Sequence, residues 1–89
     1  MENFPNVSDE KVILLRSEYD TGHVLDEKFN LSINPEQKIY SVYDGIGDAL
    51  AYIKTVFSER NDIEFTIYDN KKKVLHFFRT RDDLSRQTE

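Results

Sequence analysis

Apolar residues recur with helical spacing in one stretch of the chain, residues 44–62. Six of them fall at offsets of 0, 3, 4, 7, 10 and 11, which places them on one side of a helix: Ile46, Ala49, Leu50, Ile53, Val56 and Phe57. Asp44 is positioned to accept a hydrogen bond from the first turn, and Asp48 lies near the positive end of the helix dipole. The pattern therefore predicts one amphipathic helix that packs its apolar stripe on the rest of the fold.

Five other stretches have the patterns of β-strands. Residues 12–15 are continuously apolar, as in a strand covered on both faces, whereas residues 29–33 and 63–68 alternate apolar and polar side chains. Residues 38–43 and 74–79 complete the set, and the turn at Pro35 predicts a hairpin between the second and third strands. We therefore predict an α+β fold in the order βββαββ, a two-layer sandwich with a largely antiparallel sheet and the helix on one face.

The last strand has apolar residues on both faces, so its register depends on the turn at residues 69–72. A two- or four-residue loop directs the even-numbered residues toward the helix, and a three-residue loop with a bulge directs Leu75 and Phe77 there. We favour the second register because it keeps His76 out of the core. It leaves an apolar group on the opposite face of the sheet: Tyr68, Val74, His76 and Phe78.

A single helix covers only one face of such a sheet. The other face needs the N-terminal segment, the tail or a second subunit, and two-fold self-association is the commonest solution. We therefore predict a homodimer that uses the apolar group around Phe78 as its interface.

The composition predicts one small domain. The chain has 89 residues, of which 38% are hydrophobic and 33% charged. We assign residues 1–10 to a flexible lead-in, 11–79 to a single α+β domain and 80–89 to a charged tail. Thr80 and Asp83 have the spacing of a capping box, which favours a short helix, but the length and charge of the tail favour fraying. Without cysteine there are no disulfides, and with neither a signal-peptide pattern nor a membrane-length apolar run we expect a cytoplasmic protein that does not contact membranes.

The net charge of −5 arises in the first half of the chain. Residues 1–44 carry four Lys and Arg residues against nine Asp and Glu residues, and residues 45–89 carry eight of each. Such an imbalance favours a basic partner surface. The candidate acidic partner surface consists of Glu18, Asp20, Asp26, Glu27 and Glu36.

Two further groups of side chains invite a chemical interpretation. Three lysines at the last turn, with two later arginines, form an alternative nucleic-acid patch, although the net acidity argues against nucleic acid as the partner: Lys71, Lys72, Lys73, Arg79 and Arg81. One loop has a metal-like composition, which we interpret as a solvated acidic loop: Asp20, His23, Asp26 and Glu27. We predict no catalytic residue, no cofactor and no metal site.

These patterns predict a non-enzymatic interaction module that self-associates or binds a basic protein partner. In size, acidity and lack of cysteine the chain is similar to small bacterial inhibitor and immunity proteins, a similarity of class that no motif carries. The alternative is a nucleic-acid binder that uses the lysine hairpin.

Overall fold

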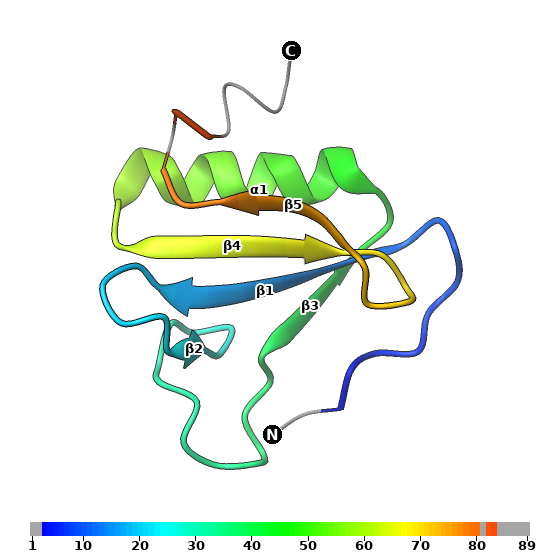
Figure 1. Ribbon diagram of the computed structural model, residues 1–89, viewed down its shortest axis with the longest axis horizontal. Helices are drawn as coiled ribbons and strands as arrows, with labels where there is room; N and C mark the ends of the chain where they lie inside the picture. The colour runs from blue at the N-terminus through cyan, green and yellow to red at the C-terminus, as the bar shows by residue number, and fades with distance from the viewer. Residues whose placement is uncertain (1–2, 81, 84–89) are drawn as a thin grey trace.

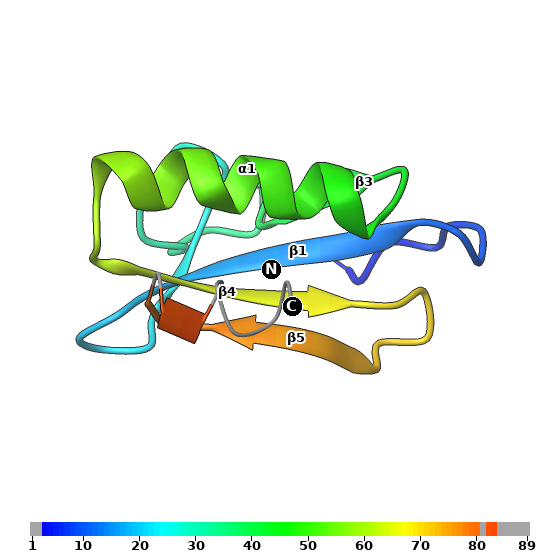
Figure 2. The same ribbon diagram turned by 90° about the horizontal axis from the view of Figure 1, so that it is seen from above.

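The computed structural model describes residues 3–80, 82 and 83, and it confirms the α+β fold. A five-stranded antiparallel sheet carries one helix on one face (Figures 1 and 2). The elements are β1 (Val12–Glu18), β2 (Val24–Leu25), β3 (Tyr40–Tyr43), α1 (Ile46–Glu59), β4 (Ile63–Tyr68) and β5 (Val74–Phe78).

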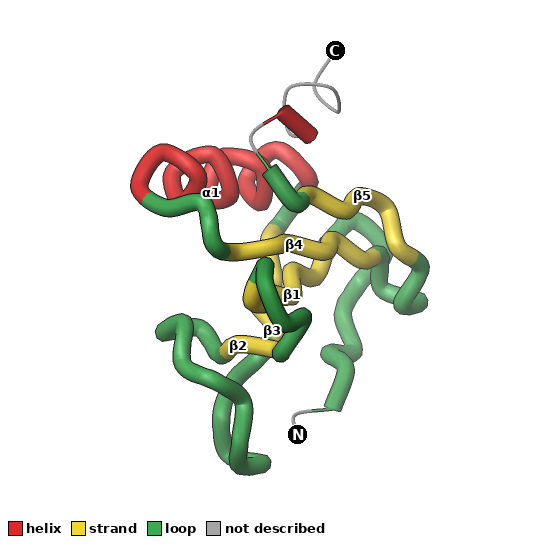
Figure 3. The backbone as a smooth tube through the Cα atoms, turned by 60° about the vertical axis from the view of Figure 1, so that its left-hand side comes forward, coloured by secondary structure: helices red, strands yellow, loops and turns green. Residues whose placement is uncertain are grey.

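β1 is the central strand of the sheet. Along one side it pairs with β4, and along the other it pairs first with β3, where Val12 lies opposite Tyr43, and then with β2, where Arg16 lies opposite Leu25. β5 pairs with β4 and forms the outer edge of the sheet among the strands that the structure describes (Figure 3). The continuously apolar start of β1 fits this central position, because Val12, Ile13 and Leu14 are all buried.

The predicted strand at residues 29–33 is wrong. The second strand is instead the two-residue β2, and of the predicted stretch only Leu31 forms a bridge, to Leu25. The expected hairpin with residues 38–43 is also absent, since β3 pairs with β1. The carboxylate of Asp26 causes this difference, because it accepts hydrogen bonds from the backbone of Lys28 and Asn30 and folds the chain into a compact loop.

α1 buries the predicted stripe, with Ala49, Ile53, Val56 and Phe57 inside and the other two stripe residues half-buried. These side chains pack against the helix-facing side of β1 and β4. The predicted helix cap is wrong, because the helix begins after Gly45 without a side-chain cap. The carboxylate of Asp44 instead accepts a hydrogen bond from the ammonium of Lys11, at 2.5 Å.

The N-terminal segment covers the centre of the face opposite α1. The ring of Phe4 meets Tyr40 of β3 and Tyr68 of β4 edge-on, with ring centroids 5.2 and 5.6 Å apart. Because β1 runs between these two strands, Phe4 lies across β1, where Ile13 is fully buried. The amide of Asn70 holds the same segment by donating to the carbonyl of Val7, at 3.2 Å.

Candidate functional site

The turn between β4 and β5 is a three-residue loop, as the favoured register requires. The N–H of Lys72 donates to the carbonyl of Asp69, the N–H of Asp69 donates to the carbonyl of Lys73, and Lys72 has a left-handed φ of 65°. The carboxylate of Asp69 accepts the N–H groups of Lys73 and Lys71 at 2.9 and 2.8 Å. These bonds, the one from Lys73 first, hold the pKa of Asp69 below its ordinary value.

A β-bulge in β5 changes the face of the sheet on which its later side chains lie. Tyr68 lies opposite Val74, but Ile67 lies opposite His76, so Leu75 is an extra residue that shifts the register of the rest of β5 by one. A one-residue shift moves every following side chain to the other face. The preferred register was therefore wrong beyond Val74, although the turn was predicted correctly.

The bulge decides which phenylalanine enters the core. Phe78 lies opposite Phe65 on the helix-facing side and is completely buried, so it does not belong to an interface on the other face. His76 also lies on the helix-facing side, where its half-buried ring stacks on Phe78 with centroids 5.6 Å apart. Phe77 points to the opposite face, which the prediction had assigned to Phe78.

The outcome is an apolar strand at the edge of the sheet. Three neighbouring side chains of β5 are large, apolar and about half exposed, and we call them the β5 surface: Val74 (53%), Leu75 (41%) and Phe77 (47%). Of the strands within the described residues, only β4 pairs with β5, along one side. The outer backbone groups and the β5 surface therefore form a candidate site for another polypeptide.

The β5 surface continues a band of side chains that crosses the sheet opposite α1. One row of the band runs from Val42 through Ile13 and Tyr68 to Val74. Phe4 covers the centre of the band, and Val42 is exposed at the far end by 43%. The N-terminal segment thus covers part of the face that we expected a second subunit to cover, and the β5 end stays open.

The alternative nucleic-acid patch is divided. The three lysines lie before β5, whereas Arg79 follows it, roughly 17 Å farther along a strand of five residues. Arg79 is also engaged, because its Nε donates to the buried carboxylate of Glu64 at 2.6 Å and its guanidinium lies 4.7 Å above the ring of Tyr19. Arg81 lies outside the described residues.

The candidate acidic partner surface is divided as well. Asp26 is buried and serves its own loop, where it also accepts a hydrogen bond from the side-chain amide of Gln37. Glu18 accepts from the hydroxyl of Thr21, and Glu27 and Glu36 share a shallow hollow with two lysines, Lys28 and Lys38. Exposed Asp20 lies in the turn after β1. Asp26 is therefore not part of an exposed acidic surface, and Glu27 and Glu36 lie beside cations.

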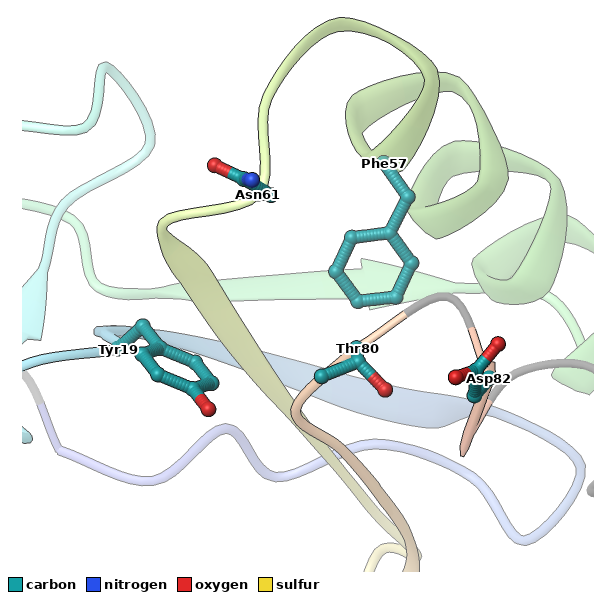
Figure 4. A pocket seen from close by; sticks show the side chains of 5 residues that line it. All are labelled: Tyr19, Phe57, Asn61, Thr80 and Asp82. Carbon is teal, nitrogen blue, oxygen red and sulfur yellow. The ribbon is translucent and has the colours of Figure 1, made fainter.

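A separate hollow of about 430 Å³ lies where the end of α1 meets the chain after β5 (Figure 4). Its described lining combines an aromatic floor with a phenol, an amide, a hydroxyl and a carboxylate: Phe57, Tyr19, Asn61, Thr80 and Asp82. These groups suit hydrogen bonding to a ligand and include no pair of nucleophile and base. Nearby, Thr80 and Asp83 exchange the two hydrogen bonds of a capping box, at 3.2 and 3.4 Å, as their spacing suggested. The fraying that we favoured for the tail concerns residues that lie mostly outside the described part of the chain.

The loop with a metal-like composition does not assemble a set of ligands. Within residues 3–80, 82 and 83, no three histidine or acidic side chains converge in a way that could hold a metal ion. In the same part of the chain, no helix has both the length and the apolar character needed to cross a membrane.

Sequence reasoning missed the residues that now define the site, Leu75 and Phe77, because it assigned them to the core. The only available signal was that both faces of the last strand are apolar, which does not indicate the register. Phe4 was missed for another reason, since an isolated aromatic residue before Pro5 has no periodic pattern around it.

Comparison with known proteins provides no family for this chain. No protein-family model matches it, and neither a curated protein nor a solved structure is similar enough to count as a match. The functional argument therefore rests on the geometry of the chain itself.

Proposed function

We propose that the protein is a non-enzymatic interaction module that associates with a second copy of itself through β5. The observation that carries this proposal is the β5 surface, three large apolar side chains on a strand whose outer edge has no partner among the described residues. Pairing two such edges satisfies the outer backbone groups and removes the apolar side chains from water in one step.

The composition of β5 supports this interpretation. Exposed edge strands are usually protected by charged residues or proline within the strand, and Val74–Phe78 contains neither. The lysines before β5 and Arg79 after it flank the strand without interrupting it. The outer edge of β5 is therefore suited to pairing with a strand of another polypeptide.

The charges around β5 favour a two-fold, antiparallel arrangement. In such a pair the start of one β5 lies beside the end of the other. The three lysines before the strand then approach Asp82 of the second copy, while Glu64 already balances the charge of Arg79. Complementary charges at both ends fix the direction of pairing.

A short edge of this kind makes a weak dimer. Three partly exposed side chains and one strand bury less than the roughly 800 Å² per partner of a standard interface, so we expect a dissociation constant on the order of 10 µM. The two-fold arrangement uses the β5 edge of both copies and therefore closes as a dimer.

Light scattering across a concentration series tests the proposal. We expect the mass to rise from 10.5 kDa toward twice that value at about 100 µM. Phe77→Lys should keep the protein monomeric, whereas the matched control Val42→Lys, on the same face but on β3, should leave the dimer intact. A wild-type protein that stays monomeric, or two variants that behave alike, would contradict the proposal.

A basic protein partner and a nucleic acid remain weaker candidates. The divided acidic surface and the divided lysine–arginine patch each offer only a few charges of one sign in one place. Titration with short single- and double-stranded nucleic acids tests the second of these directly. Salt-sensitive binding at micromolar concentrations that is lost on changing Lys71 and Lys73 to Glu would favour it over self-association.

A further inference from the structure

Arg16 is a charged side chain in the middle of the helix–sheet core. It lies on the helix-facing side of β1 and is 2% exposed. Its Nε donates to the hydroxyl of Tyr52 at 3.1 Å, and its Nη2 donates to the hydroxyl of Ser41 at 2.6 Å. Its Nη1 is buried and has no hydrogen-bond partner.

The two hydroxyls beside Arg16 each keep one hydrogen that has no acceptor within the described part of the chain. Each of the two hydroxyls accepts a hydrogen bond from Arg16, so its own hydrogen is free to donate, and among the described residues neither one has an acceptor. No described carboxylate forms an ion pair with Arg16. The buried charge, one guanidinium nitrogen and two hydroxyl hydrogens therefore have no hydrogen-bond acceptor among the described residues.

Such an arrangement is costly unless an acceptor completes it. A buried charge without a counter-ion loses its hydration, and a buried N–H without a partner loses a hydrogen bond. The ring of Tyr52 lies 5.2 Å from the guanidinium carbon and the ring of Phe29 lies 6.0 Å from it, so aromatic faces offset part of this cost. Aromatic faces do not replace the acceptor oxygens that a guanidinium binds in its plane.

The Phe29 segment lies over the Arg16 side chain and has a strained backbone. Phe29 is half-buried, has a φ of 65° and lies between Arg16 and Arg60, whose guanidinium is 4.8 Å from the ring. A bulky residue in the left-handed region is strained, and the hydrogen bonds of Asp26 to this loop offset the strain. When the Phe29 segment moves aside, the backbone strain at Phe29 is released.

We propose that Arg16, Ser41 and Tyr52 bind a small oxyanion, a carboxylate or a phosphate, when the Phe29 segment moves aside. The oxyanion supplies the acceptor that Nη1 lacks, accepts the remaining hydrogens of the two hydroxyls and balances the buried positive charge. This site faces α1, on the other side of the sheet from the β5 surface, and is independent of the proposed dimer.

Thermal unfolding with inorganic phosphate or acetate, at constant ionic strength set with sodium chloride, tests the site. We expect millimolar phosphate or acetate to raise the Tm of the wild-type protein by a few degrees, and the more effective of the two identifies the kind of oxyanion. Arg16→Met should abolish the shift. Lys54→Met is the control and should retain it, because Lys54 is exposed on α1 and lies outside the donor cluster and the Phe29 segment.

Tyr52→Phe is a second variant that tests the site even if Arg16→Met does not fold. This variant removes one donor hydroxyl and keeps the ring, and it should weaken the apparent affinity about tenfold, as expected for a hydrogen bond to a charged group. Nuclear magnetic resonance of the Arg16 Nε–H group should show a shift that saturates with the same anion. A wild-type protein that responds to neither anion, or a Tyr52→Phe variant with unchanged affinity, would overturn the proposal.

Discussion

Asp26 shows how one buried carboxylate determines the shape of a long loop. It is 8% exposed and accepts hydrogen bonds from the side-chain amide of Gln37 and from the backbone of Asn30 and Lys28. These three donors bring together the two ends of the segment between β2 and β3. They hold the pKa of Asp26 below its ordinary value, with the bond from Gln37 as the largest cause.

The lowered pKa predicts a specific response to acid. A carboxylate with a lowered folded-state pKa stabilises the fold fully above its unfolded pKa, and this contribution is lost as the pH falls below about 4 and passes through the folded-state value. Asp26→Asn should therefore flatten the acid side of the curve of unfolding free energy against pH, measured by urea denaturation. Equal curves for the wild-type and Asp26→Asn proteins would contradict the role of Asp26.

Single residues with polar partners far away in the sequence were the least predictable from the sequence. Asp44 had the right place for a helix cap, but the ammonium of Lys11, 33 residues earlier, holds its carboxylate instead. Arg16 ends an apolar run and has the appearance of a surface residue, and only the packing of β3 and α1 over β1 buries it. Local spacing contains no information about such partners.

At the scale of elements, β5 is the strand on which the account depends. A correctly predicted turn and an unpredicted bulge at Leu75 together place Phe78 inside and Phe77 outside. A bulge adds one residue without leaving a pattern in the sequence, so it could not be found from the alternation of side chains. The helix, in contrast, was predictable because six apolar positions repeat the same spacing over four turns.

The two adjacent phenylalanines provide a test of this register. Phe78→Ala should lower the free energy of unfolding by about 3–5 kcal/mol, because it leaves a cavity in the core. Phe77→Ala should lower it by less than about 1 kcal/mol, since the side chain is half exposed. Guanidinium denaturation at a low protein concentration measures both, and a larger loss for Phe77→Ala would show that the bulge is absent.

For the whole molecule, the main finding is how the two faces of one sheet are covered. α1 covers one face, and on the other the Phe4 segment covers only the centre and leaves Val42 and the β5 surface exposed at the two edges. The sequence correctly predicted that one helix would leave a face in need of cover. It could not divide that cover between the N-terminal segment and a partner, because residues 1–10 have no periodic pattern.

The role of Phe4 can be measured separately from that of β5. Phe4→Ala removes two edge-on aromatic contacts and should destabilise the protein by about 1–2 kcal/mol in chemical denaturation. The exposed Asn3→Ala variant is the control for the segment and should stay within about 0.5 kcal/mol of the wild type. If Phe4→Ala is as stable as Asn3→Ala, the segment does not cover the sheet.

Residue-resolved hydrogen exchange at two protein concentrations tests the β5 pairing most directly. The backbone amides of Val74–Phe78 that do not bond to β4 should exchange slowly well above the dissociation constant and more rapidly well below it, because pairing with a second copy protects them. The amides of β3 should exchange at the same rate at both concentrations. Rapid exchange of the outer β5 amides at both concentrations would contradict the proposed association.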